Sequence, residues 1–249
     1  MSTDHSFDGI TQKFANNIYG STKGQIRHAL LCHYLAQYQM LDIDLSSKTA
    51  LDAGCGLGHM TREIIKTNAD ITAIDISEES IAQAKKTTHG WVDWRVGSLQ
   101  SISSHFDYVY CHAVLEWTQD PLATVAHLLK CLNEGGRLSL SFFNVEAHRF
   151  GNLIYGNFAY TEQPERKAKT VRLNPQNPVS YQSVLEYLAS LDNVRVIHHA
   201  GIRCIHDYMR DISAQRRQYH EILEAEKKYG TQVPYLYLGK YCHLIIQKT

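Results

Sequence analysis

The sequence contains no pair of cysteines at the C-x-x-C spacing that zinc sites and redox motifs use. Its six cysteines are scattered along the chain, at Cys32, Cys55, Cys111, Cys131, Cys204 and Cys242. Scattered thiols argue against a disulfide framework and a zinc site, and they favour reduced cysteines in a cytosolic compartment. We therefore expect a cytoplasmic protein without a structural metal.

A long apolar run is also missing. No stretch approaches the ~18 apolar residues of a membrane-spanning helix. The opening Met-Ser-Thr-Asp-His has neither the basic region nor the apolar run of a secretory signal. We therefore expect neither a signal nor a membrane partner. The hydrophobic content of 44% is ample for one core, and 249 residues fit one α/β domain with additions or at most two small domains.

The chain has no net excess of charge, because 25 Lys and Arg balance 25 Asp and Glu. The distribution is nevertheless uneven. Residues 1–147 hold 11 basic and 16 acidic side chains, whereas residues 148–217 hold 10 basic and 6 acidic ones. A positive segment of this size suits local contact with a polyanion. An ordinary solvated face remains the alternative.

The most informative stretch is Thr-Ala-Leu-Asp-Ala-Gly-Cys-Gly-Leu-Gly-His at residues 49–59. A short apolar run ends at Asp52, glycines follow at the alternate positions Gly54, Gly56 and Gly58, and an amphipathic helical pattern comes next. This order predicts the opening βα unit of a parallel sheet, with glycines where the backbone must turn sharply and admit a ligand. The G-x-G-x-G spacing differs from the dinucleotide fingerprint G-x-G-x-x-G and is typical of S-adenosylmethionine sites. A tight turn without a ligand is the alternative.

Strand and helix patterns alternate along the chain. Strand patterns cover residues 49–53, 71–75, 92–97, 106–111, 137–143, 194–205 and 241–247. Helical patterns cover residues 23–40, 60–66, 78–86, a segment from Pro121 to Gly135-Gly136, 180–191 and 212–229. Five alternating strand–helix units followed by a strand–helix–strand tail predict a doubly wound α/β fold.

Asp75 is a candidate ribose ligand. It ends the second predicted strand, 19 residues after Gly56. An acid about 20 residues past the glycine turn accepts hydrogen bonds from ribose hydroxyls in nucleotide-binding folds. The alternative is a capping box, since Asp75-x-x-Glu78 also fits the start of a helix.

Other polar residues stand where the remaining parts of a cofactor would lie. Asp52 would face the cationic amino-acid end, or else support the turn. Leu99 and Gln100 follow the third strand, where an adenine would lie, although Gln100 also fits a surface position. His112 and Glu116 follow the fourth strand, at the carboxyl edge of the sheet where ligands bind.

Several segments resemble the bacterial tRNA 5-carboxymethoxyuridine methyltransferases, and the likeness runs essentially end to end. These segments are the lead-in Asn17-Ile-Tyr19-Gly-Ser-Thr-Lys-Gly-Gln-Ile-Arg27, His112-Ala-Val-Leu-Glu-Trp117, Gly156-Asn-Phe158, Gly201-Ile-Arg203 with His206-Asp-Tyr208, and Tyr241-x-His243. The turn departs from the family at Cys55-x-Leu57, which removes a possible acidic contact.

The resemblance implies methyl transfer from S-adenosylmethionine to the carboxylate of 5-carboxymethoxyuridine at the tRNA wobble position, giving a methyl ester. It implies a seven-stranded, mostly parallel sheet with an antiparallel last strand. Arg27 would bind the cofactor's carboxylate. The expected cofactor site as a whole comprises Arg27, Asp52, Gly54, Cys55, Gly56, Gly58, Asp75, Leu99, Gln100 and His112. We expect one methyltransferase domain over residues 1–249, with residues 1–45 over the cofactor and insertions at 144–178 and 205–240 facing the substrate.

A carboxylate nucleophile is already ionised at neutral pH, so no general base is needed. Catalysis then consists of alignment, which can supply roughly 7–11 kcal/mol. A bidentate arginine clamp would hold the charged ground state more strongly than the transition state. We therefore expect Arg203 or Arg172 to steer the distal oxygen or a phosphate, while the neutral donors Tyr19, Tyr155 or Tyr208 position the reacting oxygen.

The predicted RNA contacts are basic and aromatic. The candidates for phosphates of the anticodon stem-loop are Arg166, Lys167, Lys169, Arg172, Arg216 and Arg217. Tyr155, Phe158 and Tyr160 are candidates for stacking on the extruded base, with core packing as the alternative. A carboxyl methyltransferase acting on a small molecule or carrier protein, and a non-catalytic S-adenosylmethionine-binding protein, remain competing interpretations. The sequence does not predict the oligomeric state.

Overall fold

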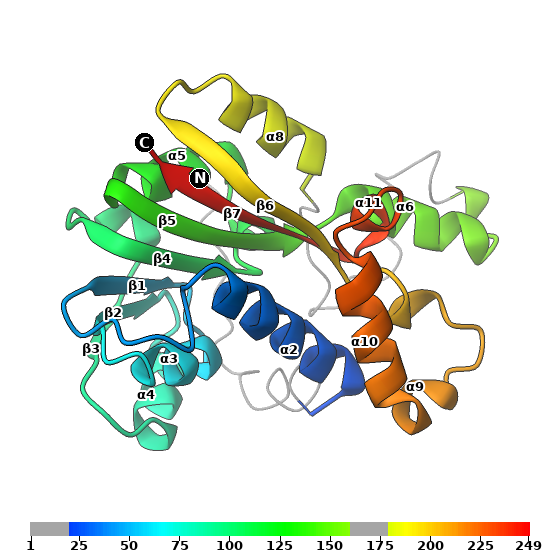
Figure 1. Cartoon of the computed structure of the whole chain (residues 1–249), viewed down its shortest axis with the longest axis horizontal. Coiled ribbons are helices and arrows are strands. Elements are labelled where there is room, and N and C mark those ends of the chain that lie inside the picture. The colour runs from blue at the N-terminus through cyan, green and yellow to red at the C-terminus, as the bar shows by residue number, and fades with distance from the viewer. Residues whose placement is uncertain (1–19, 160–178) are drawn as a thin grey trace.

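A computed structural model describes residues 20–159 and 179–249. Its centre is a seven-stranded sheet of order β3-β2-β1-β4-β5-β7-β6 (Figure 1). The strands are β1 (Thr49–Ala53), β2 (Asp70–Asp75), β3 (Asp93–Val96), β4 (Phe106–His112), β5 (Leu132–Phe143), β6 (Val194–Ile202) and β7 (Tyr241–Lys248). Strands β1 to β5 pair in parallel, and β7 pairs antiparallel with both β5 and β6. The predicted seven-stranded doubly wound sheet with an antiparallel last strand is confirmed.

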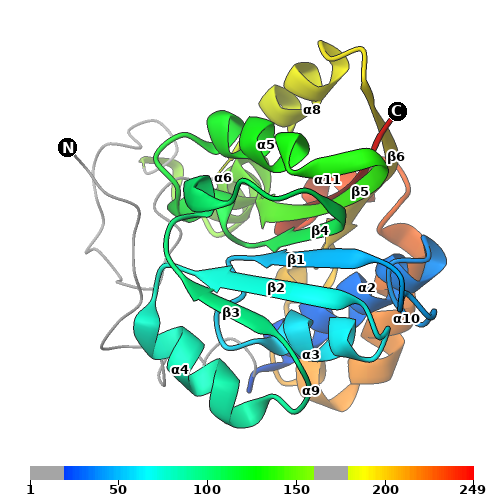
Figure 2. The same ribbon diagram turned by 90° about the vertical axis from the view of Figure 1, so that its left-hand side faces the viewer.

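Helices cover both faces of the sheet (Figure 2). One face carries α5 (Pro121–Lys130) and α8 (Tyr181–Ala189), which contribute to one apolar core. The other carries α2 (Thr22–Gln37), α3 (His59–Ile65), α4 (Glu78–Thr87) and α10 (Tyr219–Tyr229), which contribute to a second core. The carboxyl ends of the parallel strands therefore lie at one edge between two helical layers, which is where such folds bind ligands.

Helix α2 is positioned by a polar cap and an apolar stripe. Ser21 caps its first turn by accepting from the Gly24 backbone N–H at 3.3 Å. Ile26, Leu30 and Leu35 are fully buried at helical spacing, so this face packs on the sheet. The packing fixes the helix that carries the predicted cofactor residue Arg27.

The predicted boundary between α5 and β5 is wrong. The sequence suggested that Gly135-Gly136 end the helix, but α5 ends at Lys130 and β5 begins at Leu132. Gly135 has a φ of +75°, and the register with β4 shifts between Phe106 and Tyr108. These glycines therefore belong to an irregularity within the paired strand, where a positive φ is needed without ending the strand.

The segments after β5 and β6 contain more helix than predicted. Residues 145–154 form α6 (Val145–Ile154) in the expected insertion, capped by Asn144. The predicted helix at 212–229 is divided into α9 (Ala214–Arg217) and α10, and α11 (Tyr235–Leu238) precedes β7. Three 3₁₀ turns complete the described chain: η1 (Leu99–Ser101), η2 (Leu115–Trp117) and η3 (His206–Tyr208).

Candidate active site

The glycine turn joins β1 to α3 with a left-handed backbone. Gly54, Gly56 and Gly58 have φ values of +75°, +50° and +71°. A Cβ on Gly54 would lie 2.4 Å from a methyl of Val114, whereas a Cβ on Gly56 would meet no atom within 4 Å. Gly54 is therefore required by packing and Gly56 by backbone conformation. The open side of Gly56 leaves space for a ligand next to the turn.

Asp75 lies beside this turn at the end of β2. Its carboxylate accepts from the Gly56 N–H at 2.8 Å and from the Ser77 N–H at 2.9 Å. Helix α4 is capped by Ser77, which accepts from the Ser80 N–H. The alternative capping box that begins at Asp75 is therefore wrong, and the carboxylate is held against the glycine turn instead.

Asp52 links the start of the glycine turn to helix α3. It is buried and accepts from the Thr61 hydroxyl of α3 at 2.6 Å. Burial raises the pKa of Asp52 from its ordinary value of 3.8 to about 7, although the Thr61 hydrogen bond opposes the shift. This contact supports the turn. A role of Asp52 toward the cofactor stays a prediction.

His112 ends β4, and Glu116 lies in the middle of η2. The Nε2 atom of His112 is 2.7 Å from the Ser139 hydroxyl. Burial, with Arg27 nearby, lowers the pKa of His112 to about 3, so its imidazole is neutral at physiological pH. Glu116 is 1% exposed, and burial raises its pKa to about 7. These two residues place a neutral imidazole and a buried carboxyl group at the ligand edge.

Leu99 and Gln100 form η1, beyond the end of β3. The Leu99 carbonyl oxygen lies at hydrogen-bond distance, 2.9 Å, from His127 Nε2 of α5. Gln100 is exposed. Cys55 is buried in the glycine turn, and burial raises the pKa of its thiol. The structure therefore brings the glycine turn and Asp75 into direct contact, while η1 remains separately anchored on α5.

Two arginines contact the same aromatic ring at the ligand edge of the sheet. The guanidinium carbons of Arg27, from α2, and of Arg203, which follows β6, lie 5.0 Å and 5.4 Å from the centroid of Tyr241. Tyr241 begins β7. Cation–π contact of this kind suits a partly desolvated site for an anion. The sequence reasoning did not select Tyr241 for the site, although it lies in the Tyr241-x-His243 motif of the family resemblance.

Arg203 is also held by a polar network. Its guanidinium donates to Asp207 at 2.8 Å, and both side chains are largely buried. His206 Nδ1 lies 2.9 Å from the other Asp207 oxygen, and His206 Nε2 lies 3.0 Å from the Thr22 hydroxyl. Burial by itself raises the pKa of Asp207, but Arg203, His206 and Lys23 outweigh it and hold that pKa well below the ordinary range. Asp207 is therefore ionised and fixes the arginine.

Glu226 of α10 supports the turn that carries this network, and sequence reasoning missed it. Its buried carboxylate accepts from the backbone N–H groups of Cys204, Ile205 and His206, each at 2.9 Å. A glutamate in a polar helical pattern looks like a surface residue. No sequence signal marked this one.

The predicted substrate and RNA residues have different surroundings. The Tyr208 hydroxyl donates to the Leu238 carbonyl at 2.8 Å, so its proton is already engaged. Tyr155 is 68% exposed after α6. Arg216 and Arg217 are exposed on α9, and Arg217 pairs with Asp211 at 3.1 Å. Tyr19, Tyr160, Arg166, Lys167, Lys169 and Arg172 lie outside the described residues.

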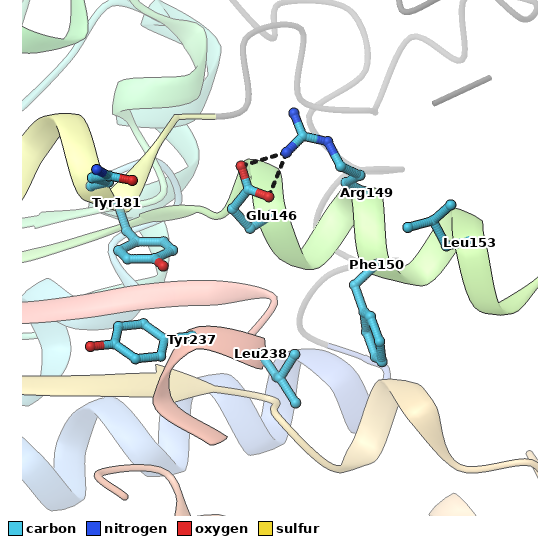
Figure 3. Close-up of a pocket in the computed structure, with 8 residues that line it drawn as sticks. Glu146, Arg149, Phe150, Leu153, Tyr181, Tyr237 and Leu238 are labelled. Atoms are coloured by element: carbon cyan, nitrogen blue, oxygen red, sulfur yellow. Dashed lines mark hydrogen bonds and ion pairs between the residues drawn. The ribbon is translucent and has the colours of Figure 1, made fainter. Parts of the chain in front are cut away.

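A hollow of about 530 Å³ lies between α6, the start of α8 and α11 (Figure 3). The Tyr181 and Tyr237 rings form one wall, nearly parallel with centroids 5.1 Å apart. Glu146 and Arg149 pair at 2.6 Å on the α6 side. Phe150 also lines it. This hollow combines flat aromatic surface with hydrogen-bonding groups.

Within residues 20–159 and 179–249, no group of three or more His, Cys, Asp or Glu side chains is arranged to hold a metal ion. In the same part of the chain, every helix is too short or too polar to span a membrane.

The sheet order, together with a glycine turn after β1 and an acid at the end of β2, defines a class I S-adenosylmethionine-dependent methyltransferase. A protein-family model described as a methyltransferase domain matches residues 51–138. Solved structures have the same fold. The plantazolicin methyltransferase BpumL in complex with SAH aligns with a TM-score of 0.62 and 16% identity, over 97% of this chain and 91% of that chain. Magnesium protoporphyrin IX methyltransferase from Synechocystis PCC 6803 aligns with a TM-score of 0.64 and 14% identity, over 98% and 96%.

The relationship is closer to a tRNA-modifying protein. The chain is 33% identical to the tRNA 5-carboxymethoxyuridine methyltransferase of Escherichia coli (strain K12), over 98% of this chain and 97% of that protein. The chain therefore belongs to the tRNA 5-carboxymethoxyuridine methyltransferase family. S-adenosylmethionine is its methyl donor, and the open side of Gly56 with the adjoining Asp75 carboxylate fits the nucleoside part of this cofactor.

Proposed function

We propose that this protein transfers the methyl group of S-adenosylmethionine to the carboxylate of 5-carboxymethoxyuridine at the wobble position of tRNA. The near full-length likeness to a protein of that name supports the substrate. The observation that carries the proposal is the pair of arginines on Tyr241, because these two cations lie at the ligand edge, where the carboxylates of the cofactor and of the substrate must both be held.

The reaction forms one bond and breaks one bond. A carboxylate oxygen attacks the methyl carbon, the bond from that carbon to the sulfonium breaks, and its electron pair stays on sulfur. No proton moves. A negative and a positive charge cancel as the ester and the neutral thioether form. A site with little water favours this cancellation.

The environment of Arg203 suits a carboxylate that must react. An isolated arginine would stabilise the anionic ground state and slow the attack. Asp207 shares the charge of this arginine through a 2.8 Å contact, and the Tyr241 ring lies against it. Arg203 therefore directs the distal oxygen without contributing a full uncompensated charge. The neutral imidazole of His112 adds no further cation at this edge.

The surface of α6 supports contact with unpaired nucleotides of the anticodon loop. Large apolar side chains are exposed along it and after it, and they are Phe150, Leu153, Ile154, Tyr155 and Phe158. The hollow beside them offers the Tyr181–Tyr237 wall (Figure 3). RNA readers stack extruded bases on such aromatic surfaces. The exposed arginines of α9 supply charge for phosphates.

The proposal is tested by incubating the protein with labelled S-adenosylmethionine and tRNA from a strain that lacks its gene. We expect a base-labile methyl ester on the wobble uridine. Transfer RNA without the carboxymethoxy group serves as the control and should take no label. Label on a small molecule or a carrier protein, with none on tRNA, would refute the proposal.

Arg203→Ala tests the role of the arginine in the same assay. We expect kcat/KM for tRNA to fall by roughly 10-fold or more, because a charged hydrogen bond to substrate is lost, while affinity for the cofactor product stays near that of the wild type. Arg195→Ala removes an exposed arginine from β6 and is the matched control. If both rate and tRNA affinity survive in Arg203→Ala, the assignment is wrong.

A further inference from the structure

A buried hydrogen-bond chain runs from the reaction edge into the sheet. His112 Nε2 lies 2.7 Å from the Ser139 hydroxyl oxygen, which lies 2.9 Å from His243 Nε2. Ser139 and His243 are fully buried. The strand register places Ser141 opposite both His112 and His243, and Ser139 two residues away, so all four side chains share one face of the sheet.

The single proton of the Ser139 hydroxyl links the protonation of the two histidines. If Ser139 donates to His112 Nε2, the His112 proton is on Nδ1, and His243 Nε2–H donates to the Ser139 oxygen. If Ser139 donates to His243 Nε2 instead, His243 carries its proton on Nδ1, and His112 donates through Nε2. A neutral imidazole has one donor and one acceptor nitrogen, so these two arrangements exclude each other.

The surroundings of His243 Nδ1 favour one of these two proton arrangements. His243 Nδ1 is buried and has no hydrogen-bond partner among the described residues. The rings of His198 and Tyr34 pack near His243, with centroids 5.1 Å and 5.9 Å from its own. A buried N–H group without an acceptor is rarer than an acceptor left bare. The arrangement with a bare His243 Nδ1, and hence with the His112 proton on Nδ1, is favoured.

The Nδ1 atom of His112 is available to a ligand. It makes no hydrogen bond to the described residues, and it is not among their fully buried unpartnered atoms, so it keeps some exposure at the carboxyl end of β4. We propose that Ser139 and His243 are positioning residues that hold His112 as the Nδ1–H tautomer, so that it donates to a carboxylate oxygen in the reaction site. The low pKa of His112, caused by burial, keeps this donor neutral.

Two carboxylates reach this edge, one on the amino-acid end of the cofactor and one on the proposed substrate. The shared chemistry is an N–H donor meeting an anionic oxygen. Only the second source depends on the proposed function. The test therefore needs one measurement of the tautomer, one of cofactor-product binding and one of turnover.

Nitrogen-15 NMR of the labelled protein reads the tautomer directly. We expect the wild-type His112 signals to show a protonated Nδ1. Ser139→Ala and His243→Phe should each shift His112 toward a mixture with the Nε2–H tautomer, because the hydrogen bonds that select the Nδ1–H tautomer are lost. Ser141→Ala is the matched control, since this hydroxyl is buried on the same strand and has no hydrogen-bond partner in the part of the chain that the structure describes. A wild-type His112 protonated on Nε2 would overturn the proposal.

Binding and turnover identify the carboxylate. If it belongs to the cofactor, Ser139→Ala should weaken S-adenosylhomocysteine binding by roughly 10-fold, and binding of its decarboxylated analogue should not change. If it belongs to the substrate, binding should be unchanged while kcat on tRNA falls by a similar factor, and Ser139→Thr should restore part of it. A Ser139→Ala protein that matches Ser141→Ala in tautomer, binding and turnover would overturn the proposal. Because the first two measurements need no tRNA, they remain decisive if tRNA is not the substrate.

Discussion

At the scale of single residues, two glycines of the turn after β1 have different roles, one in stability and one in ligand binding. Gly54 and Gly56 both have a positive φ, but only Gly54 has a neighbour where a Cβ would project, the Val114 methyl at 2.4 Å. Gly54 is required because Val114 packs against the turn, and Gly56 leaves room for the ligand. Substitution at the two positions should therefore have different consequences.

We expect Gly54→Ala to reduce the free energy of unfolding by about 2–4 kcal/mol, since the left-handed backbone and the clash with Val114 both oppose a side chain. Gly56→Ala should cost only about 1–2 kcal/mol from the backbone but should weaken S-adenosylhomocysteine binding. Chemical denaturation and calorimetric titration measure the two effects. Adding Val114→Ala to Gly54→Ala should recover part of the stability, and no recovery would contradict the clash.

The buried Asp52 carboxyl makes the free energy of unfolding depend on pH. Its pKa is raised by burial to about 7 in the folded protein, against an ordinary value of 3.8. Between these values the folded state holds a proton that the unfolded state has released, so the free energy of unfolding falls as pH rises. We expect the stability of Asp52→Asn relative to wild type to increase by roughly 2–4 kcal/mol from pH 4.5 to 7.5.

Asp107→Asn provides the control for this comparison, measured by denaturation at each pH. Burial raises the pKa of Asp107, but hydrogen bonds from Thr49 and Lys48 outweigh it and lower the pKa overall. Its contribution is therefore lost only at pH values below those tested. The difference between Asp107→Asn and wild type should stay constant from pH 4.5 to 7.5. A constant difference for Asp52→Asn as well would contradict the assigned shift.

At the scale of elements, the turn between β6 and η3 depends on a helix from elsewhere in the chain. Glu226 of α10 accepts three backbone N–H groups from residues 204–206. The same turn carries Arg203, whose φ is +61°, and leads into η3 with its partner Asp207. Helix α10 thus supports the turn that carries the predicted substrate residue Arg203.

We expect Glu226→Gln to destabilise the protein by about 2–4 kcal/mol, because an amide N–H₂ replaces an acceptor among three donors. Turnover on tRNA should fall as well, since Arg203 loses its fixed position. Thermal unfolding and steady-state kinetics measure both effects. Glu221→Gln, at an exposed position of the same helix, should change neither. Wild-type stability in Glu226→Gln would show that the carboxylate is not required.

At the scale of the whole molecule, acidic side chains predominate in residues 1–147 and basic ones in residues 148–217. The glycine turn and Asp75 come from the acidic part at residues 1–147, while α9 comes from the more basic part at 148–217. Figure 1 shows α9 and α6 on the same side of the view, away from α4. We therefore expect tRNA to approach the protein from the side that carries α9.

Salt dependence tests this direction of approach. The slope of log affinity for tRNA against log salt concentration should decrease by about one to two in an Arg216→Ala, Arg217→Ala double variant, because each phosphate contact contributes roughly 0.7–0.9. Lys85→Ala with Lys86→Ala removes the same charge from exposed positions of α4 and should leave the slope unchanged. Equal slopes for both double variants would contradict a specific role for α9.

The parts of the fold that depend on contiguous residues could be predicted. The apolar run, the alternate glycines and the helical pattern of residues 49–66 determine β1, the turn and α3, because local periodicity and backbone conformation act over a few residues. The glycine turn indicated the cofactor and the family motifs added the substrate class, while the role of Arg203 stays a prediction. The boundary at Gly135 was misjudged because a glycine can end a helix or relieve an irregular strand, and only pairing with β4 decides between these.

Tertiary structure alone decided which distant residues complete the site. Tyr241 meets Arg27 and Arg203, and Ser139 meets His112 and His243, only because strand order makes β4, β5, β7 and β6 neighbours. The orientation of a buried donor or carboxylate depends on partners far away in sequence, since burial removes the water that would otherwise satisfy it. Sequence by itself therefore determined the cofactor turn and the chemistry, and packing determined how the charges and protons around it are held.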